Sequence, residues 1–138
     1  MVGMTRILTA WAATAVVMVA LDLLWLGLIA KPLYQQGIGH LMAAQPNVQV
    51  AVLFYALYAT GLVVFAVWPA EAAPGWSKAL LSGALFGFFA YATYDLTNLA
   101  TLKDWPVALS LIDIAWGTCV SAVSATAGKF ALDRLSAG

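Results

Sequence analysis

Residues 48–68 read VQVAVLFYALYATGLVVFAVW, a run of 21 positions without a single Asp, Glu, Lys or Arg. About 20 such residues are needed to carry a helix across the hydrocarbon core of a bilayer. A helix satisfies its backbone hydrogen bonds internally, and the run is too long for one strand of a membrane barrel. The run therefore predicts a transmembrane helix, which ends before Pro69 because proline cannot continue the helical hydrogen bonding.

Three further apolar runs of similar length lie at residues 7–30, 79–102 and 105–127. Of the whole chain, 64% is hydrophobic and 9% is charged, whereas soluble domains are about one-quarter charged. A soluble fold of this size could not bury so much apolar surface. The sequence therefore predicts an all-α fold, a single transmembrane domain over residues 1–138 that forms an integral membrane bundle of four helices.

The orientation of the bundle is predicted from the basic residues near the helix ends. Four crossings place both termini on one side of the membrane. That side holds four basic residues and the opposite side holds two, namely Arg6, Lys78, Lys129 and Arg134 against Lys31 and Lys103. Because Lys and Arg favour the cytoplasmic side, we expect a multi-pass protein with cytoplasmic termini.

The long connection between the first two runs, residues 31–47, is mildly amphipathic. Pro32 suits the first turn of a helix and Pro46 would end one. The sequence is equally compatible with a short interfacial helix and with a simple loop, so both interpretations stay open at this point.

Three aspartates, Asp22, Asp95 and Asp113, each interrupt an apolar helix. An ionised carboxylate at such a position costs at least ~2.5–3.5 kcal/mol on insertion scales. Each aspartate lies eight or nine residues from the charged residue at the outer end of its helix. That spacing corresponds to roughly 12–14 Å of helix, whereas half the hydrocarbon core is about 15 Å. The three carboxyls are therefore expected in one layer, just outside the midplane.

Polar and aromatic side chains accompany the aspartates at helical spacing. Tyr91, Asp95 and Asn98 lie at i, i+4 and i+7, on one face of the third helix. Within about one turn of an aspartate lie three further aromatic residues, Tyr94, Trp25 and Trp116. Together with Asp22 and Asp113, these residues make eight candidates. We predict that the eight form a ligand- or proton-binding site on the first, third and fourth helices. The second helix is expected to serve mainly as scaffold.

Carboxyls in a low-dielectric site have a limited set of roles, because low dielectric penalises their charged form. They can act as acid and base, share a proton, or hold a hard divalent cation, here at Asp22, Asp95 and Asp113. The sequence contains no HExxH, CxxC or paired-His motif, so we expect neither zinc nor haem, and it contains no nucleotide motif. With zero net charge and no basic face, nucleic acid is excluded as a partner.

Three classes of function remain open at this stage, and no catalytic residue is assigned. The first is an intramembrane carboxylate site that binds or processes a small or lipid-like ligand. The second is a proton- or ion-coupled transporter acting as a homo-oligomer. The third is a non-catalytic subunit of a larger membrane complex, in which the aspartates only form packing hydrogen bonds, worth about 0.6 kcal/mol each on average. We favour the first because three carboxyls on three helices share one depth.

Three stretches resemble a known family. The run YDLTNLATLKDW at residues 94–105, followed by DIAWG at residues 113–117, is similar to a family of small bacterial membrane proteins catalogued as domain of unknown function 2177. The run DLLWLG at residues 22–27, with Lys31 and Tyr34 after it, resembles the same family. The resemblance implies four helices and a bacterial inner membrane, and it lends no activity.

Overall fold

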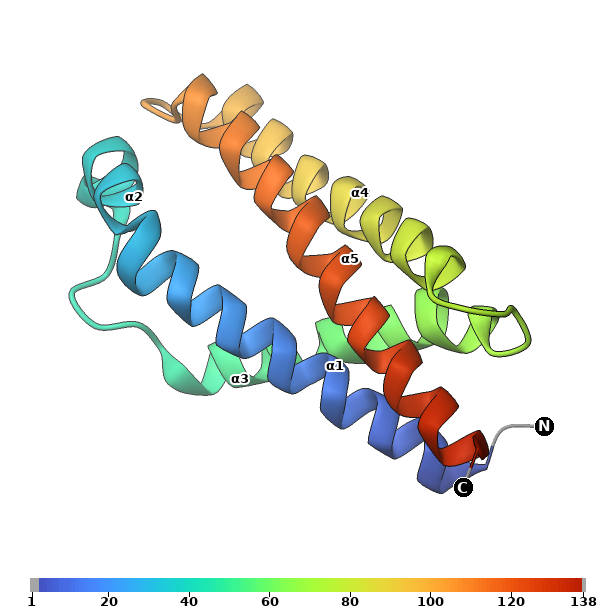
Figure 1. Cartoon of the computed structure of the whole chain (residues 1–138). Coiled ribbons are helices and arrows are strands. Elements are labelled where there is room, and N and C mark those ends of the chain that lie inside the picture. Colours follow the sequence, from blue (N-terminus) through green and yellow to red (C-terminus); the bar gives the residue numbers. More distant parts are fainter. Residues whose placement is uncertain (1–2, 138) are drawn as a thin grey trace.

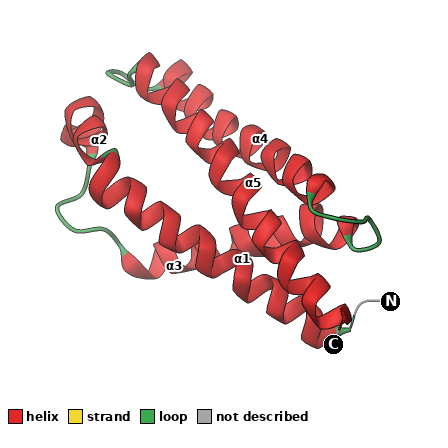
Figure 2. Ribbon diagram, in the orientation of Figure 1, coloured by secondary structure: helices red, strands yellow, loops and turns green. Residues whose placement is uncertain are grey.

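The computed structural model describes residues 3–137, and within them all regular structure is helical (Figure 2). Among these residues, four helical segments are long and apolar enough to cross a membrane, which confirms the predicted multi-pass all-α bundle. The elements are α1 (Met4–Leu24) with a π-helical turn (Trp25–Ile29), α2 (Lys31–Ile38) with a 3-10 turn (Gly39–Leu41), α3 (Val48–Leu62) with a π-helical turn (Val63–Val67) and a 3-10 turn (Trp68–Ala70), α4 (Ser77–Thr101) and α5 (Val107–Ala137).

Two of the membrane helices widen into a π-helical turn shortly before a proline. The turn Trp25–Ile29 precedes Pro32, and the turn Val63–Val67 precedes Pro69. Proline has no backbone N–H, so the ordinary helical bonding cannot continue through it. In the first turn, the amide of Ala30 donates to the carbonyl of Trp25 at 2.7 Å, the longer-range bond of a π-helix. This turn follows Asp22 closely and begins with Trp25.

Helices α4 and α5 lie side by side and antiparallel, and they form the most extensive helix pair in the fold (Figure 1). Their close approach depends on glycine. A Cβ added at Gly83 would lie 2.7 Å from Ala125 Cβ, and a Cβ added at Gly87 would collide with the carbonyl oxygen of Gly117. Small residues of this kind allow helix backbones to approach closely in membranes. Helix α1 also packs against α5.

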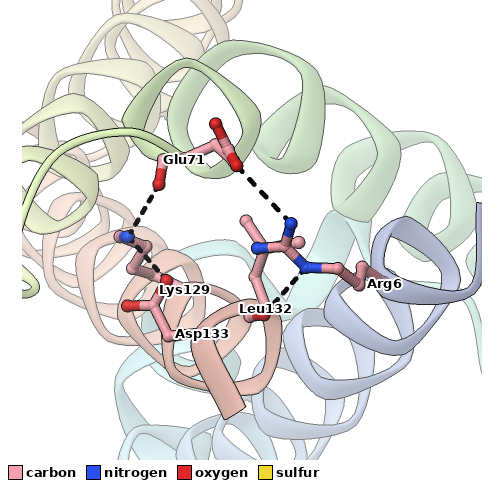
Figure 3. Close-up of polar contacts among 5 residues, drawn as sticks. All are labelled: Arg6, Glu71, Lys129, Leu132 and Asp133. Atoms are coloured by element: carbon pink, nitrogen blue, oxygen red, sulfur yellow. Dashed lines mark hydrogen bonds and ion pairs between the residues drawn. The ribbon is translucent and has the colours of Figure 1, made fainter. Parts of the chain in front are cut away.

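A polar network, made by Arg6, Glu71, Lys129, Leu132 and Asp133, joins three segments at one end of the bundle (Figure 3). Arg6 donates to the Leu132 carbonyl at 3.2 Å and pairs with Glu71 at 3.5 Å. Lys129 donates to Asp133 Oδ1 at 2.8 Å and to the Glu71 carbonyl at 3.4 Å. The start of α1 and the end of α5 therefore lie at the same end of the bundle, as four crossings require.

The helix limits differ from the predicted ones mainly at α5. The fourth helix was expected over residues 105–127, but α5 begins at Val107, after Pro106, and continues to Ala137. The helix continues through the charged residues near its C-terminal end, where Lys129 and Asp133 form an i, i+4 ion pair that supports the helical conformation. In the connection 31–47, both open interpretations hold in part, since α2 and a 3-10 turn occupy residues 31–41 and an irregular segment follows.

Candidate functional site

A cavity of about 460 Å³ lies among the helices, toward the end of the bundle opposite the polar network. Fifteen residues line it, and all five helices contribute. Three of the lining residues are the aspartates Asp22, Asp95 and Asp113, eight are aromatic, and four are Leu, Ile or Ala. The wall is therefore mostly apolar, with carboxyls as its acidic groups.

Asp22 joins three helices through its carboxyl group. It is buried on α1, where it accepts a hydrogen bond from the Tyr55 hydroxyl of α3 at 2.5 Å. The indole N–H of Trp116, on α5, donates to its other oxygen at 2.8 Å. Both oxygens of this carboxyl therefore have a neutral donor.

The indole rings of Trp25 and Trp116 stack beside Asp22. Their centroids lie 4.4 Å apart and their planes differ by 4°. The Trp25 N–H donates to the Tyr34 hydroxyl at 3.3 Å. Because each indole N–H is engaged at its edge, the orientation of the stacked pair is fixed from both sides.

Asp113 is linked to α2, the short helix outside the membrane spans. The Tyr34 hydroxyl donates to Asp113 Oδ1 at 2.5 Å. Burial, and then the hydrogen bond to this carboxylate, raise the pKa of Tyr34 above its ordinary value of 10. Tyr34 therefore remains a protonated donor at neutral pH, and it holds α2 against α5.

Asp95 differs from the other two aspartates. Its side chain is 1% exposed, and neither carboxyl oxygen has a hydrogen-bond donor among the described residues. Its acidic neighbour is Asp113 on the adjacent helix α5. Two adjacent carboxyls in a low-dielectric site cannot easily both be ionised, and they commonly share a proton. This pair can therefore hold a proton, or bind a group that donates hydrogen bonds.

The structure brings most of the predicted site residues to one cavity. Its wall includes seven of the eight candidates, namely Asp22, Asp95, Asp113, Tyr91, Tyr94, Trp25 and Trp116. Asn98 is half-buried about one turn beyond Asp95 on α4 and is not part of the wall. That these residues bind a ligand or a proton stays a prediction.

The expectation that the second helix is mainly scaffold was wrong. Tyr55, on α3, donates to Asp22, and both Phe54 and Tyr58 line the cavity. The spacing of Tyr55 and Tyr58, three positions apart on one helical face, was a signal for this role. Tyr34 was missed as a site residue because the sequence did not decide whether residues 31–47 form a helix or a loop, so the direction of its side chain could not be predicted.

The described residues that line the cavity carry no basic side chain. Within residues 3–137, the lining contains no Lys, Arg or His. In the same part of the chain, no group of three or more His, Cys, Asp or Glu side chains is arranged to hold a metal ion. The divalent-cation hypothesis for Asp22, Asp95 and Asp113 therefore gains no support from the geometry and stays a prediction.

Comparisons with known proteins place the chain in a family. No curated protein and no solved structure matches it. One family model, described as a predicted membrane protein (DUF2177), matches residues 7–130 and so includes the cavity and most of all four membrane spans. The resemblance noted at residues 22–27, 94–105 and 113–117 is thereby confirmed, and the chain belongs to the DUF2177 family of membrane proteins.

Proposed function

We propose that this protein binds a small amphipathic ligand in the cavity around Asp95. One observation carries the proposal: the Asp95 carboxyl is 1% exposed on the wall of a cavity, and apart from a proton that it can share with Asp113 it has no hydrogen-bond donor among the described residues. A buried polar group left unpaired costs about 1–3 kcal/mol, and more when it is charged. A ligand that supplies the donor would remove this cost, because its polar end would complete the site.

The rest of the wall suits the apolar body of such a ligand. A volume of about 460 Å³ falls within the range of small-molecule sites, roughly 300–1,000 Å³. Such sites are mainly hydrophobic and aromatic, with a few polar groups that fix the orientation of the ligand. Both oxygens of Asp95 are covered by neighbouring protein atoms. The ligand would therefore reach them by a small adjustment of neighbouring side chains.

Proton-coupled transport is the second candidate, and the adjacency of Asp95 and Asp113 favours it. A carboxyl pair that shares a proton can exchange that proton for another ligand. The polar network around Lys129 joins the bundle at the end away from the cavity. For transport, the same binding site would also have to become accessible from each side of the membrane in turn.

The topology of this proposal follows from the basic residues. We place the protein in a bacterial inner membrane with both termini in the cytoplasm, because four basic residues lie near that face and two near the other. Asp22, Asp95 and Asp113 would then lie in the outer half of the bilayer, so the ligand would enter from the outer leaflet or the periplasm.

Native mass spectrometry of the purified protein tests the binding function. Released from detergent micelles, the parent protein should carry a small molecule that Asp95→Asn loses. The matched control is Asp104→Asn, since Asp104 is an exposed loop residue with φ of 60°, a conformation that Asn also tolerates. Equal retention by parent, control and Asp95→Asn would contradict a role for Asp95 in binding.

A further inference from the structure

We infer that the ligand's polar end is a protonated amine, an inference that rests on the proposed binding function. The cavity presents three carboxyls, and within residues 3–137 no basic side chain lines it. The donors to Asp22 and Asp113 are two tyrosine hydroxyls and an indole, all of them neutral. The wall therefore has an excess of acidic groups that the protein itself does not compensate.

Two of the six Lys and Arg residues are paired with acidic groups away from the cavity. Lys129 and Arg6 take part in the polar network at the opposite end, where Asp133 and Glu71 face them. A buried carboxylate is strongly disfavoured unless a proton or a positive charge compensates it. A ligand cation can replace a proton without leaving any carboxyl uncompensated, whereas an anionic ligand would add repulsion from all three carboxyls.

The aromatic part of the wall favours the same ligand. Eight aromatic side chains line the cavity, and aromatic faces attract organic cations through their negative electrostatic potential. The edges of the stacked indoles are occupied, because Trp25 donates to Tyr34 and Trp116 donates to Asp22. Each stacked ring covers one face of the other, so the outer faces of the pair are what the two rings can offer a ligand.

Hydrogen bonding narrows the class from organic cations to amines that bear N–H groups. Apart from a proton that it can share with Asp113, Asp95 has no hydrogen-bond donor among the residues that the structure describes. A quaternary ammonium would supply charge and aromatic contact but no hydrogen bond. A protonated primary or secondary amine supplies both, as in the stronger charge-assisted hydrogen bonds between ammonium and carboxylate groups. The expected ligand is therefore an amine on an apolar, ring-sized or chain-like body.

Three probes of nearly equal shape test this inference: phenylbutylamine, phenylbutanol and phenylbutyrate. The full-length protein is held in nanodiscs of zwitterionic phosphatidylcholine, so that the lipid surface does not itself attract cations. Binding is followed by the melting temperature and by the tryptophan near-ultraviolet circular dichroism, which reports on the stacked Trp25 and Trp116 pair. We expect the amine to bind at least about tenfold more tightly than the alcohol, and the carboxylate not to bind.

The variants add a second measurement. Asp95→Asn should weaken amine binding by about tenfold or more, whereas Asp104→Asn should leave it unchanged. The probe comparison on the parent protein needs no variant, so it decides the inference even if Asp95→Asn folds poorly. If the alcohol binds as tightly as the amine, the cation inference falls while the proposed binding function stands. If no probe binds, the cation inference also falls, and the native mass spectrum decides the binding function separately.

Discussion

The Tyr55 hydroxyl donates to Asp22 Oδ2 at 2.5 Å, which ties α3 to α1 at the depth of the cavity. In a membrane this bond has no water to replace it, so its removal leaves a buried oxygen unpaired. Tyr55→Phe should lower the free energy of unfolding by about 1–2 kcal/mol, near the upper end of hydrogen bonds between membrane helices. Equilibrium unfolding in mixed sodium dodecyl sulfate micelles would measure the loss.

Tyr94→Phe is the matched control for this change. Tyr94 lines the same cavity, is half exposed, and its hydroxyl has no hydrogen bond to another described residue. Loss of this hydroxyl should leave the free energy of unfolding nearly unchanged. If Tyr55→Phe and Tyr94→Phe had the same stability, the bond to Asp22 would contribute nothing to the bundle.

The contact between α4 and α5 gives a second prediction. Gly87→Ala should lower the free energy of unfolding by about 1–3 kcal/mol, because its methyl group would collide with Gly117 and Ser121 of the facing helix. Gly27→Ala is the control, since a Cβ at Gly27 has no heavy atom within 4 Å. The same unfolding assay measures both variants. Equal stability of the two would show that the helix pair tolerates separation and that glycine is not needed for its contact.

The sequence predicted the parts of the structure that depend on composition and spacing along one helix. Apolar length predicted the four membrane spans, which are confirmed. The distance of Asp22, Asp95 and Asp113 from the helix ends predicted a common depth; the three residues line one cavity, and their depth in the bilayer stays a prediction. A carboxylate within an apolar helix indicates a polar site from the sequence alone, because the free-energy cost of placing a carboxylate in lipid does not depend on how the helices pack.

Two parts of the site could not be predicted, because they depend on how separate helices face one another. Tyr34 reaches Asp113 only because α2 folds back over the bundle after the π-helical turn at Trp25–Ile29. Tyr55 faces Asp22 because of the rotation of α3 about its axis, which its nearly uniform apolar sequence does not indicate. The sequence pattern is informative about depth, and much less about rotation.

Topology is the third prediction. With both termini in the cytoplasm, green fluorescent protein fused after the C-terminus should fluoresce in a bacterial host, because it matures only on the inside. A phosphatase reporter inserted near Gln45, in the irregular part of the connection 31–47, should be active in the periplasm. The reverse pair of results would overturn the topology and place the three aspartates in the inner half of the bilayer.

The ion pair of Lys129 and Asp133 provides the last prediction, through a cycle of variants. The Lys129 side chain is 2% exposed and lies 2.8 Å from Asp133, whose side chain is 41% exposed. Removing one member of a buried pair leaves a charge without its partner, whereas replacing both is often nearly neutral. Asp133→Ala should therefore lower the free energy of unfolding by about 1–2 kcal/mol, less than for a fully buried pair because solvent screens Asp133.

Lys129→Met combined with Asp133→Ala should be more stable than Asp133→Ala alone, since methionine fills the same space without a charge. Arg134→Gln, at the exposed neighbouring position, should change little. A double variant less stable than Asp133→Ala would instead show that Lys129 stabilises this end of the bundle mainly through its bond to the Glu71 carbonyl.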